Sequence, residues 1–442
     1  MGFENKLRTE IEKIKIIDTH EHTMAEEGRL KYKLDFSPLF MAYVAGDLIS
    51  SGMPMHMIDR VTAEFRLARA RGEGRVIPEE LLNRAKGLET SSEEKWGIIA
   101  PYWENTRTTG YGKALLLAVR DLFGVDDINE KTYAKISNII SEKNKKGYYQ
   151  WVLKDRAGID ISICPTQFAD LDTIDRKFFA PVFGFDDPVL LCYSDKKGIE
   201  DTENRFSRKL KSIDSLVELI EFIAGESRKK GAIGAKCGIA YSRTLKFEDV
   251  GSAEAESVFG KLLDGKPVHI KPLQDYLMHR ALEILEKLEM PIQIHAGIQA
   301  GNGNYLTNSK PTHLTNLFFR YPKLKFDIFH AGYPYSSELA VLAKNFPNVY
   351  ADMCWMYIIT PSASKRILHE WIDTIPNNKI FGFGGDCAMV EMSYAHSRFA
   401  REIIYQVLIE RWKSGYFNEE ECIMLARKML RDNPANFFKI NN

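Results

Sequence analysis

Two stretches with the same ending decide how this chain folds: Pro291-Ile-Gln-Ile-His295-Ala-Gly297 and Phe326-Asp-Ile-Phe-His330-Ala-Gly332. Each is a short apolar run that ends in a histidine followed by Ala-Gly. Short apolar runs of this kind are typical of strands buried on both faces, as in parallel sheets. Helical patterns at Asp275–Leu288 and Ser336–Asn345 precede the first stretch and follow the second. Strand and helix therefore alternate in this part of the chain.

The same alternation extends outward in both directions. Strand candidates occur at Ile14–Ile17, Ile159–Cys164, within Val182–Cys192, and at Ile233–Cys237, Ile292–His295, Phe326–His330, Val349–Met353 and Ile380–Phe383. Alternating strands and helices predict a parallel sheet with right-handed crossovers. Because there are eight candidates, we expect an α/β protein with a closed (β/α)8 TIM barrel. A doubly wound open sheet is the alternative.

The residues between the first two strands break this rhythm. Residues 24–157 contain no convincing strand, and helical spacing recurs at Met57–Arg71, Pro78–Ala85, Ala114–Phe123 and Glu130–Lys143. We interpret 24–157 as a large helical insertion after strand 1, within a single barrel domain covering 1–442. The C-terminal tail is also predicted to be helical, with Tyr394–Lys413 followed by Glu419–Leu430. Asn418 and Glu421 form a capping-box pattern at the start of the second of these helices.

Composition excludes several classes of partner. The chain has 442 residues, and its 60 Lys and Arg are balanced by 60 Asp and Glu. This balance gives no basic footprint, so we expect neither nucleic acid nor a membrane as a partner, but a small-molecule substrate. The N-terminal segment lacks a signal-peptide core, and the six cysteines form no CxxC pair. We therefore expect a cytoplasmic protein with reduced cysteines; assembly into a homo-oligomer is left open.

The first strand leads into a polar stretch, Asp18-Thr19-His20-Glu21-His22. Barrel enzymes keep their active sites at the C-terminal ends of the strands. Side chains alternate along a strand, so His20 and His22 should point the same way and Glu21 the opposite way. Two imidazoles on one face can chelate a cation, although a His-x-His pair alone is a weak signal.

Three other strands end in the same manner. His295 and His330 end two of them, and Asp386 follows the last. A single histidine at such a position is usually a core residue, but four polar strand ends at one depth favour a metal site. Imidazoles with a carboxylate suit Zn²⁺, whereas a set richer in oxygen would suit Mn²⁺ or Fe²⁺.

These motifs resemble the metal-dependent amidohydrolase superfamily. Within it they are similar to the amidohydrolase-related (amidohydrolase 2) group, with its nodulin-like and uronate isomerase-like relatives. Besides the His-x-His pair and the two His-Ala-Gly endings, the segments Asn348–Asp352 and Asp432–Phe438 carry this resemblance. It covers 14–23 and about 158–440, and the insertion matches only loosely. The resemblance implies a (β/α)8 barrel with a metal centre.

The resemblance also implies a role for each site residue. His20, His22, His295 and Asp386 would hold the metal. His330 occupies the position of a histidine that stays near the metal and moves protons in mononuclear relatives, so His330 and Asp386 are the expected catalytic residues.

Lys236 is the ambiguous residue of the predicted site. It lies near the place where binuclear relatives carry a carboxylated lysine, but its surroundings also match mononuclear relatives. Lys236 is therefore a second-metal or substrate residue, and one ion is favoured over two.

A bound divalent ion lowers the pKa of its water toward ~7 and polarises a carbonyl. The site thus predicts a metal-dependent hydrolase acting on an amide, ester or lactone-type bond of a small, carboxylate-bearing substrate. A non-oxidative decarboxylase or a uronate isomerase-like enzyme on the same centre is the alternative. A catalytically silent metal- or ligand-binding protein is a further one.

Four more residues are candidates for substrate binding. Arg107 lies in a segment of the insertion, Trp103–Gly112, that resembles a pocket-reaching segment of uronate isomerases and nodulin-like proteins, and its guanidinium could hold a carboxylate. Tyr241 and Arg243 follow Lys236, and Trp355 follows the seventh strand. The insertion would form a cap beside the metal and select the substrate.

Overall fold

The structure is a computed structural model that describes residues 2–41, 43–72, 90–184, 186 and 195–440. One parallel sheet contains its strands in the order β1 to β8, so each strand pairs with the next along the chain. The strands are β1 (Ile16–Asp18), β2 (Ile159–Thr166), β3 (Phe179–Gly184), β4 (Ala235–Cys237), β5 (Ile292–Ile294), β6 (Phe326–Ile328), β7 (Val349–Asp352) and β8 (Ile380–Phe381). A doubly wound sheet would reverse its order at a switch point, so that alternative is wrong.

The first and last strands meet just beyond their ends and close the sheet. The backbone N–H of Thr19 donates to the carbonyl of Phe383 (3.1 Å), and the N–H of Asp386 donates to the carbonyl of His20 (2.7 Å). The (β/α)8 barrel is therefore confirmed. The third strand begins earlier than expected, at Phe179, and the part of its predicted range at 187–192 lies outside the described residues.

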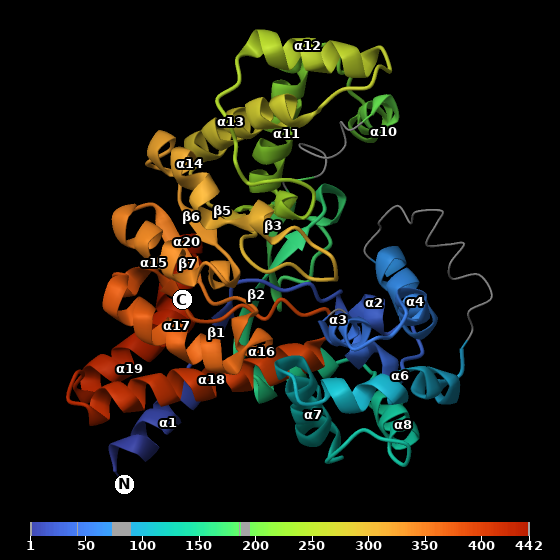
Figure 1. Cartoon of the computed structure of the whole chain (residues 1–442), viewed down its shortest axis with the longest axis vertical. Coiled ribbons are helices and arrows are strands. Elements are labelled where there is room, and N and C mark those ends of the chain that lie inside the picture. The colour runs from blue at the N-terminus through green and yellow to red at the C-terminus, as the bar shows by residue number, and fades with distance from the viewer. Residues whose placement is uncertain (1, 42, 73–89, 185, 187–194, 441–442) are drawn as a thin grey trace.

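Helices surround the barrel, as Figure 1 shows. Those between β3 and β8 are α10 (Lys196–Phe206), α11 (Ile213–Lys229), α12 (Ser252–Leu263), α13 (Lys271–Lys287), α14 (Thr315–Arg320), α15 (Ser336–Asn345), α16 (Met356–Ile359) and α17 (Pro361–Thr374). The helix predicted at Ser336–Asn345 has the observed bounds of α15. The other predicted helix starts four residues early, at Lys271-Pro272, because proline fits the first turn of a helix.

The segment between β1 and β2 is helical wherever the structure describes it. It contains α2 (Glu26–Arg29), α3 (Tyr43–Ser50), α4 (Met55–Gly72), α6 (Ser92–Thr106), α7 (Gly110–Phe123), α8 (Tyr133–Lys143) and the π-helical η2 (Gln150–Arg156). In Figure 1, α2 to α8 lie together beside the barrel. This arrangement confirms a helical insertion after strand 1. The helix predicted at Pro78–Ala85 lies outside the described residues.

A buried ion pair joins this insertion to the C-terminal helices. The tail contains α18 (Val390–Lys413), α19 (Glu419–Arg427), the π-helical η9 (Lys428–Asp432) and α20 (Asn433–Phe438), and the capping box at Asn418 and Glu421 is present. The guanidinium of Arg29 donates to both carboxylate oxygens of Glu391 in α18, at 3.0 and 2.6 Å. The two side chains are 2% and 0% exposed, so the insertion is fixed to α18 from inside. None of the described helices is long and apolar enough to cross a membrane.

Candidate metal centre

Three of the expected ligand atoms lie together at the C-terminal end of the barrel. The Nε2 atoms of His20 and His22 are 3.2 Å apart. Asp386 Oδ1 lies 3.1 Å from His22 Nε2 and 3.7 Å from His20 Nε2. Ligand atoms held tetrahedrally at about 2.0–2.2 Å from one Zn²⁺ lie roughly 3.3–3.6 Å apart. The three side chains therefore have the spacing of ligands to one cation.

Buried carboxylates below this cluster fix its backbone. Asp18 Oδ1 accepts hydrogen bonds from the N–H groups of His20 (3.2 Å) and Gly385 (2.8 Å). Glu21 points away from the cluster, as the alternation along the strand predicted, and its Oε2 accepts from Cys387 N–H at 2.7 Å. A side-chain carbon on Gly385 would collide with the Glu21 carboxylate, so only glycine fits there.

Three strand ends at the site hold non-glycine residues in the left-handed region of backbone space. The φ angles are +57° at His330, +67° at Trp355 and +53° at Asp386. Such conformations cost on the order of 1–3 kcal/mol each and persist where the surroundings enforce them, typically at functional sites. The barrel therefore enforces a strained backbone at the ends of β6, β7 and β8, and this backbone sets the direction of the three side chains.

His295 lies next to His330 and outside the group formed by His20, His22 and Asp386. Its Nδ1 is 3.0 Å from His330 Nε2, and its Nε2 is 2.9 Å from the carbonyl of Ile298. The other nitrogen of His330, Nδ1, faces the carbonyl of Cys354 at 3.2 Å. If each ring donates to its carbonyl, the lone pairs of His295 Nδ1 and His330 Nε2 face each other. This pair of histidines is thus arranged to receive a proton or a cation.

Burial sets the charge states of the cluster. It lowers the pKa of His20 and His295 well below the usual range and that of His330 to about 4, so these imidazoles are neutral at pH 7 and able to act as ligands. Burial opposes ionisation of Asp386, but the hydrogen bond from His22 and nearby positive charge outweigh it and lower the pKa of that carboxyl. A neutral-imidazole and carboxylate set is what a divalent cation requires.

Lys236 extends from β4 toward the same cluster. Its ammonium lies 4.1 Å from the centre of the Phe329 ring, and the structure records no ion pair between it and another described residue. Burial lowers the pKa of Lys236, while the charge of Asp386 opposes that shift. A buried amine in this setting can bind a substrate anion or contribute to a second metal site, and these are the two roles expected from the sequence.

The insertion contributes two aromatic residues that the sequence analysis missed. Tyr43 from α3 stacks on Trp355 with ring centres 4.3 Å apart, and Tyr111 from α7 stacks on Tyr43 at 5.3 Å. The Tyr43 hydroxyl donates to the backbone carbonyl of Asp386. Trp355 in turn lies 5.2 Å from His330, edge to face. These three rings therefore form one wall beside the cluster, and the Trp103–Gly112 segment reaches the site through Tyr111.

The structure does not bring either of the expected arginines to the cluster. Arg107 donates to Asp127 (2.7 Å) and Glu104 (3.2 Å) within the insertion. Arg243 pairs with the buried Asp275 at 2.6 Å. Their donors are engaged by these carboxylates, because a buried or half-buried guanidinium requires such partners.

Tyr241 lies beside His295. Its ring centre is 4.7 Å from that of His295, and its hydroxyl accepts a hydrogen bond from the N–H of Ala300 at 3.0 Å.

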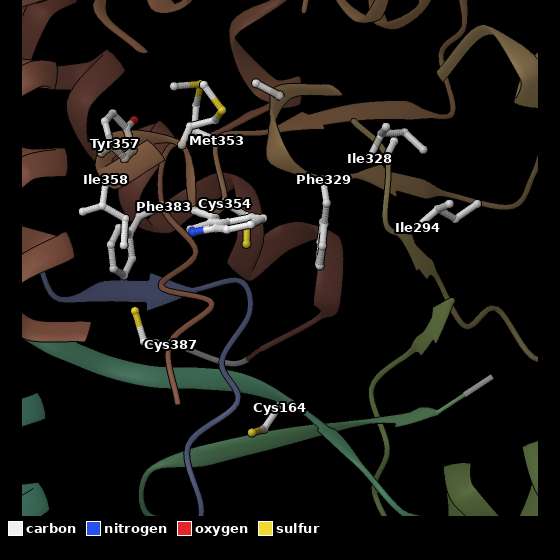
Figure 2. Close-up of a cluster of buried hydrophobic side chains, with 14 of the residues drawn as sticks. Cys164, Ile294, Ile328, Phe329, Met353, Cys354, Tyr357, Ile358, Phe383 and Cys387 are labelled. Atoms are coloured by element: carbon white, nitrogen blue, oxygen red, sulfur yellow. The ribbon is translucent and has the colours of Figure 1, made fainter. Parts of the chain in front are cut away.

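A thiol also joins the site without having been expected. One ligand atom each of His330, Cys354 and Asp386 lie within 4.8 Å of one another. Cys354 is fully buried just beyond β7, and Figure 2 shows it between Phe329 and Phe383. A lone cysteine after a strand carries no sequence signal of this role, because only the fold places it beside His330.

Comparisons with known proteins agree with this architecture. Residues 256–440 match the family model described as amidohydrolase, and this match confirms the resemblance to the amidohydrolase superfamily. Protein fluG of Emericella nidulans is 27% identical over 223 residues, which are 47% of this chain and 26% of that protein. The chain thus matches about a quarter of the length of that relative.

Solved structures match almost the whole chain. The uronate isomerase of Thermotoga maritima is 14% identical with a TM-score of 0.78, covering 99% of this chain and 97% of that one. The glucuronate isomerase of Caulobacter crescentus is 17% identical with a TM-score of 0.73, covering 100% and 94%. A protein described as a metal-dependent hydrolase from Lactobacillus casei is 14% identical with a TM-score of 0.65, covering 98% and 97%. At these identities the likeness shows a shared fold.

Proposed function

We propose that this chain is a metal-dependent hydrolase that cleaves an amide, ester or lactone-type bond of a small carboxylate-bearing substrate. The observation that carries the proposal is the spacing of the His20, His22 and Asp386 ligand atoms, at 3.1–3.7 Å from one another. These residues would hold one divalent cation, with Zn²⁺ as the first expectation. Such a cation polarises a carbonyl and makes water a nucleophile near neutral pH.

Asp386 and His330 are proposed to move the protons. Asp386 Oδ2 faces His330 Nε2 at 3.8 Å, so a water proton accepted by the carboxylate has a second acceptor close by. Burial keeps His330 neutral, and in the tautomer whose Nδ1–H donates to the Cys354 carbonyl its Nε2 can accept a proton. His295 Nδ1, 3.0 Å away, can share the proton before it passes to the leaving group.

Substrate recognition is proposed to fall to Lys236 and the aromatic wall. The Lys236 ammonium is buried beside the cluster, where an anion of the substrate could pair with it at low dielectric. Tyr43, Tyr111 and Trp355 form a stack of aromatic rings on the side of the insertion. A small acid with an apolar or ring-shaped body fits both features.

The test is hydrolysis by the Zn²⁺-loaded full chain of a panel of lactones, esters and amides of small acids. We expect activity on carboxylate-bearing members, and a loss of at least about 10²-fold in Asp386→Asn, because this variant removes a metal ligand and a proton acceptor together. Arg107→Ala should keep wild-type activity because its guanidinium is engaged by Asp127. Turnover that survives Asp386→Asn, or none across the panel, would contradict the proposal.

A uronate isomerase-like activity is the second candidate. It is favoured by the match of the whole chain, insertion included, to solved uronate isomerases. Isomerisation moves a hydrogen between adjacent carbons of a sugar acid and consumes no water. Incubation with uronates in D₂O, followed by NMR, separates the two: aldose–ketose conversion supports the isomerase, whereas cleavage of the lactone panel supports the hydrolase. Release of CO₂ in either assay would indicate the decarboxylase alternative.

A further inference from the structure

Beside the proposed cation, β6, β7 and β8 bring a second set of ligand groups together. One ligand atom each from His330, Cys354 and Asp386 lie within 4.8 Å of one another. We propose that these residues form a second, thiol-containing cation position, at which Zn²⁺ or Cd²⁺ binds as an inhibitor. This inference rests on the proposed function, because it takes the first cation to lie at His20, His22 and Asp386.

The two oxygens of Asp386 face different neighbours. Oδ1 lies 3.1 Å from His22 Nε2, whereas Oδ2 lies 3.8 Å from His330 Nε2. A carboxylate with this orientation can bridge two cations, which in two-metal sites are about 3.5–4 Å apart. The second position is therefore adjacent to the first and shares one ligand with it.

His330 offers an electron pair in the required place. Its Nδ1 lies 3.2 Å from the carbonyl of Cys354, and in the tautomer that donates to this carbonyl the lone pair is on Nε2. The Nδ1 atom of His295 lies 3.0 Å from His330 Nε2. When both rings donate to their backbone carbonyls, these two nitrogens are both acceptors, and a cation between Asp386 and His330 would satisfy Nε2.

The thiol of Cys354 is held in place by its surroundings. Its backbone N–H donates to Asp352 Oδ1 at 2.8 Å, and a side-chain carbon on Gly384 would lie 2.7 Å from its sulfur. The neighbouring strand end therefore leaves room for the sulfur only because residue 384 is glycine. Cys164, Cys237, Cys387 and Cys422 are buried too, but among the described residues none of them belongs to a metal-ligating group.

The chemistry of the set selects soft cations. Thiolate and imidazole ligands suit Zn²⁺ and still softer ions such as Cd²⁺, whereas Mg²⁺ and Mn²⁺ prefer oxygen. Coordination deprotonates the thiol outright, so each ion that binds forms one metal–sulfur bond and releases one proton to the buffer. The bound ion also occupies His330 Nε2 and Asp386 Oδ2, the atoms proposed to move protons. Occupancy should therefore stop turnover.

Titration of the chelator-stripped full chain with Co²⁺ tests the proposal, because visible bands report ligation and a near-ultraviolet charge-transfer band reports a thiolate ligand. We expect both bands at two equivalents of Co²⁺. Cys354→Ser should lose the charge-transfer band and bind the second equivalent at least tenfold more weakly, while it keeps the visible bands. The matched control is Cys164→Ser, which should keep both bands. The Cys164 thiol donates to the Glu21 carbonyl at 3.0 Å, and a serine hydroxyl can make the same hydrogen bond. A second equivalent of Zn²⁺ should inhibit the wild type but not Cys354→Ser.

Two results overturn the thiol position and leave the first cation intact: visible bands with no charge-transfer band, or a charge-transfer band that survives Cys354→Ser. No Co²⁺ binding at all would overturn this inference and the proposed function together. If Cys354→Ser does not fold, X-ray absorption of the Co²⁺-loaded wild type decides the question. A sulfur neighbour at about 2.3 Å supports the position, and a shell of nitrogen and oxygen alone contradicts it.

Discussion

Replacing Arg29 by methionine should destabilise the protein strongly, because Arg29 neutralises a carboxylate that has no access to water. Glu391 is 0% exposed and receives two hydrogen bonds from the Arg29 guanidinium, at 3.0 and 2.6 Å. Removing one partner of a buried ion pair costs about 3–5 kcal/mol, because the other charge is left uncompensated. About 4 kcal/mol corresponds to roughly a thousandfold change in the unfolding equilibrium.

Urea unfolding, followed by circular dichroism, measures this loss in Arg29→Met. The double variant Arg29→Met/Glu391→Leu removes both charges and should recover most of the stability, leaving a loss of about 1–2 kcal/mol for the hydroxyl of Tyr148 that then lacks its acceptor. The exposed pair of Lys6 and Glu419 is the control: Lys6→Met should cost about 0–1 kcal/mol. A loss below about 1 kcal/mol in Arg29→Met, or a double variant less stable than Arg29→Met, would refute the reasoning.

Two further predictions concern charge. Calorimetry should show that Lys236→Met binds small carboxylates about 10–100-fold more weakly, as expected for the loss of one charge-assisted hydrogen bond, and keeps its metal. The control Arg107→Ala should change the same affinity less than twofold. Loss of metal from Lys236→Met would instead make the lysine a metal ligand. Burial lowers the pKa of His396 from 6.5 to about 4. Between these two pH values the unfolded chain binds a proton that the folded chain does not, so the free energy of unfolding falls as the pH falls from 6.5 to 4. His396→Gln in chelator should reduce the pH slope of the unfolding free energy there by about 1.4 kcal/mol per pH unit, and an unchanged slope would refute this.

The barrel and most of the cluster could be predicted because their signals are local. Short apolar runs, each followed by a turn, fixed the strands, and polar residues directly after those runs had to meet at one end of the barrel. The His-x-His pair and Asp386 follow from this rule alone. His295 obeys it too, but a local pattern does not show that its ring turns toward His330 rather than toward His20.

The rest of the site depends on contacts between distant segments. Tyr43 and Tyr111 belong to a helical insertion whose sequence does not reveal which helix faces the cluster of His20, His22 and Asp386. Arg107 looked available because its partner Asp127 lies twenty residues away on the chain, where no pattern connects them. Cys354 acquires its neighbours only when β7 and β8 pair. Long-range side-chain contacts of this kind are set by packing, which periodicity cannot encode.

Metal analysis of protein purified without chelator is the sharpest test of the proposed metal centre. We expect at least one divalent transition metal per chain in the wild type. We also expect that Asp386→Asn, which keeps the size of the side chain but removes its charge, falls well below half an equivalent. Wild-type protein without stoichiometric metal, or an Asp386→Asn variant that keeps its full metal content, would contradict the proposed metal centre.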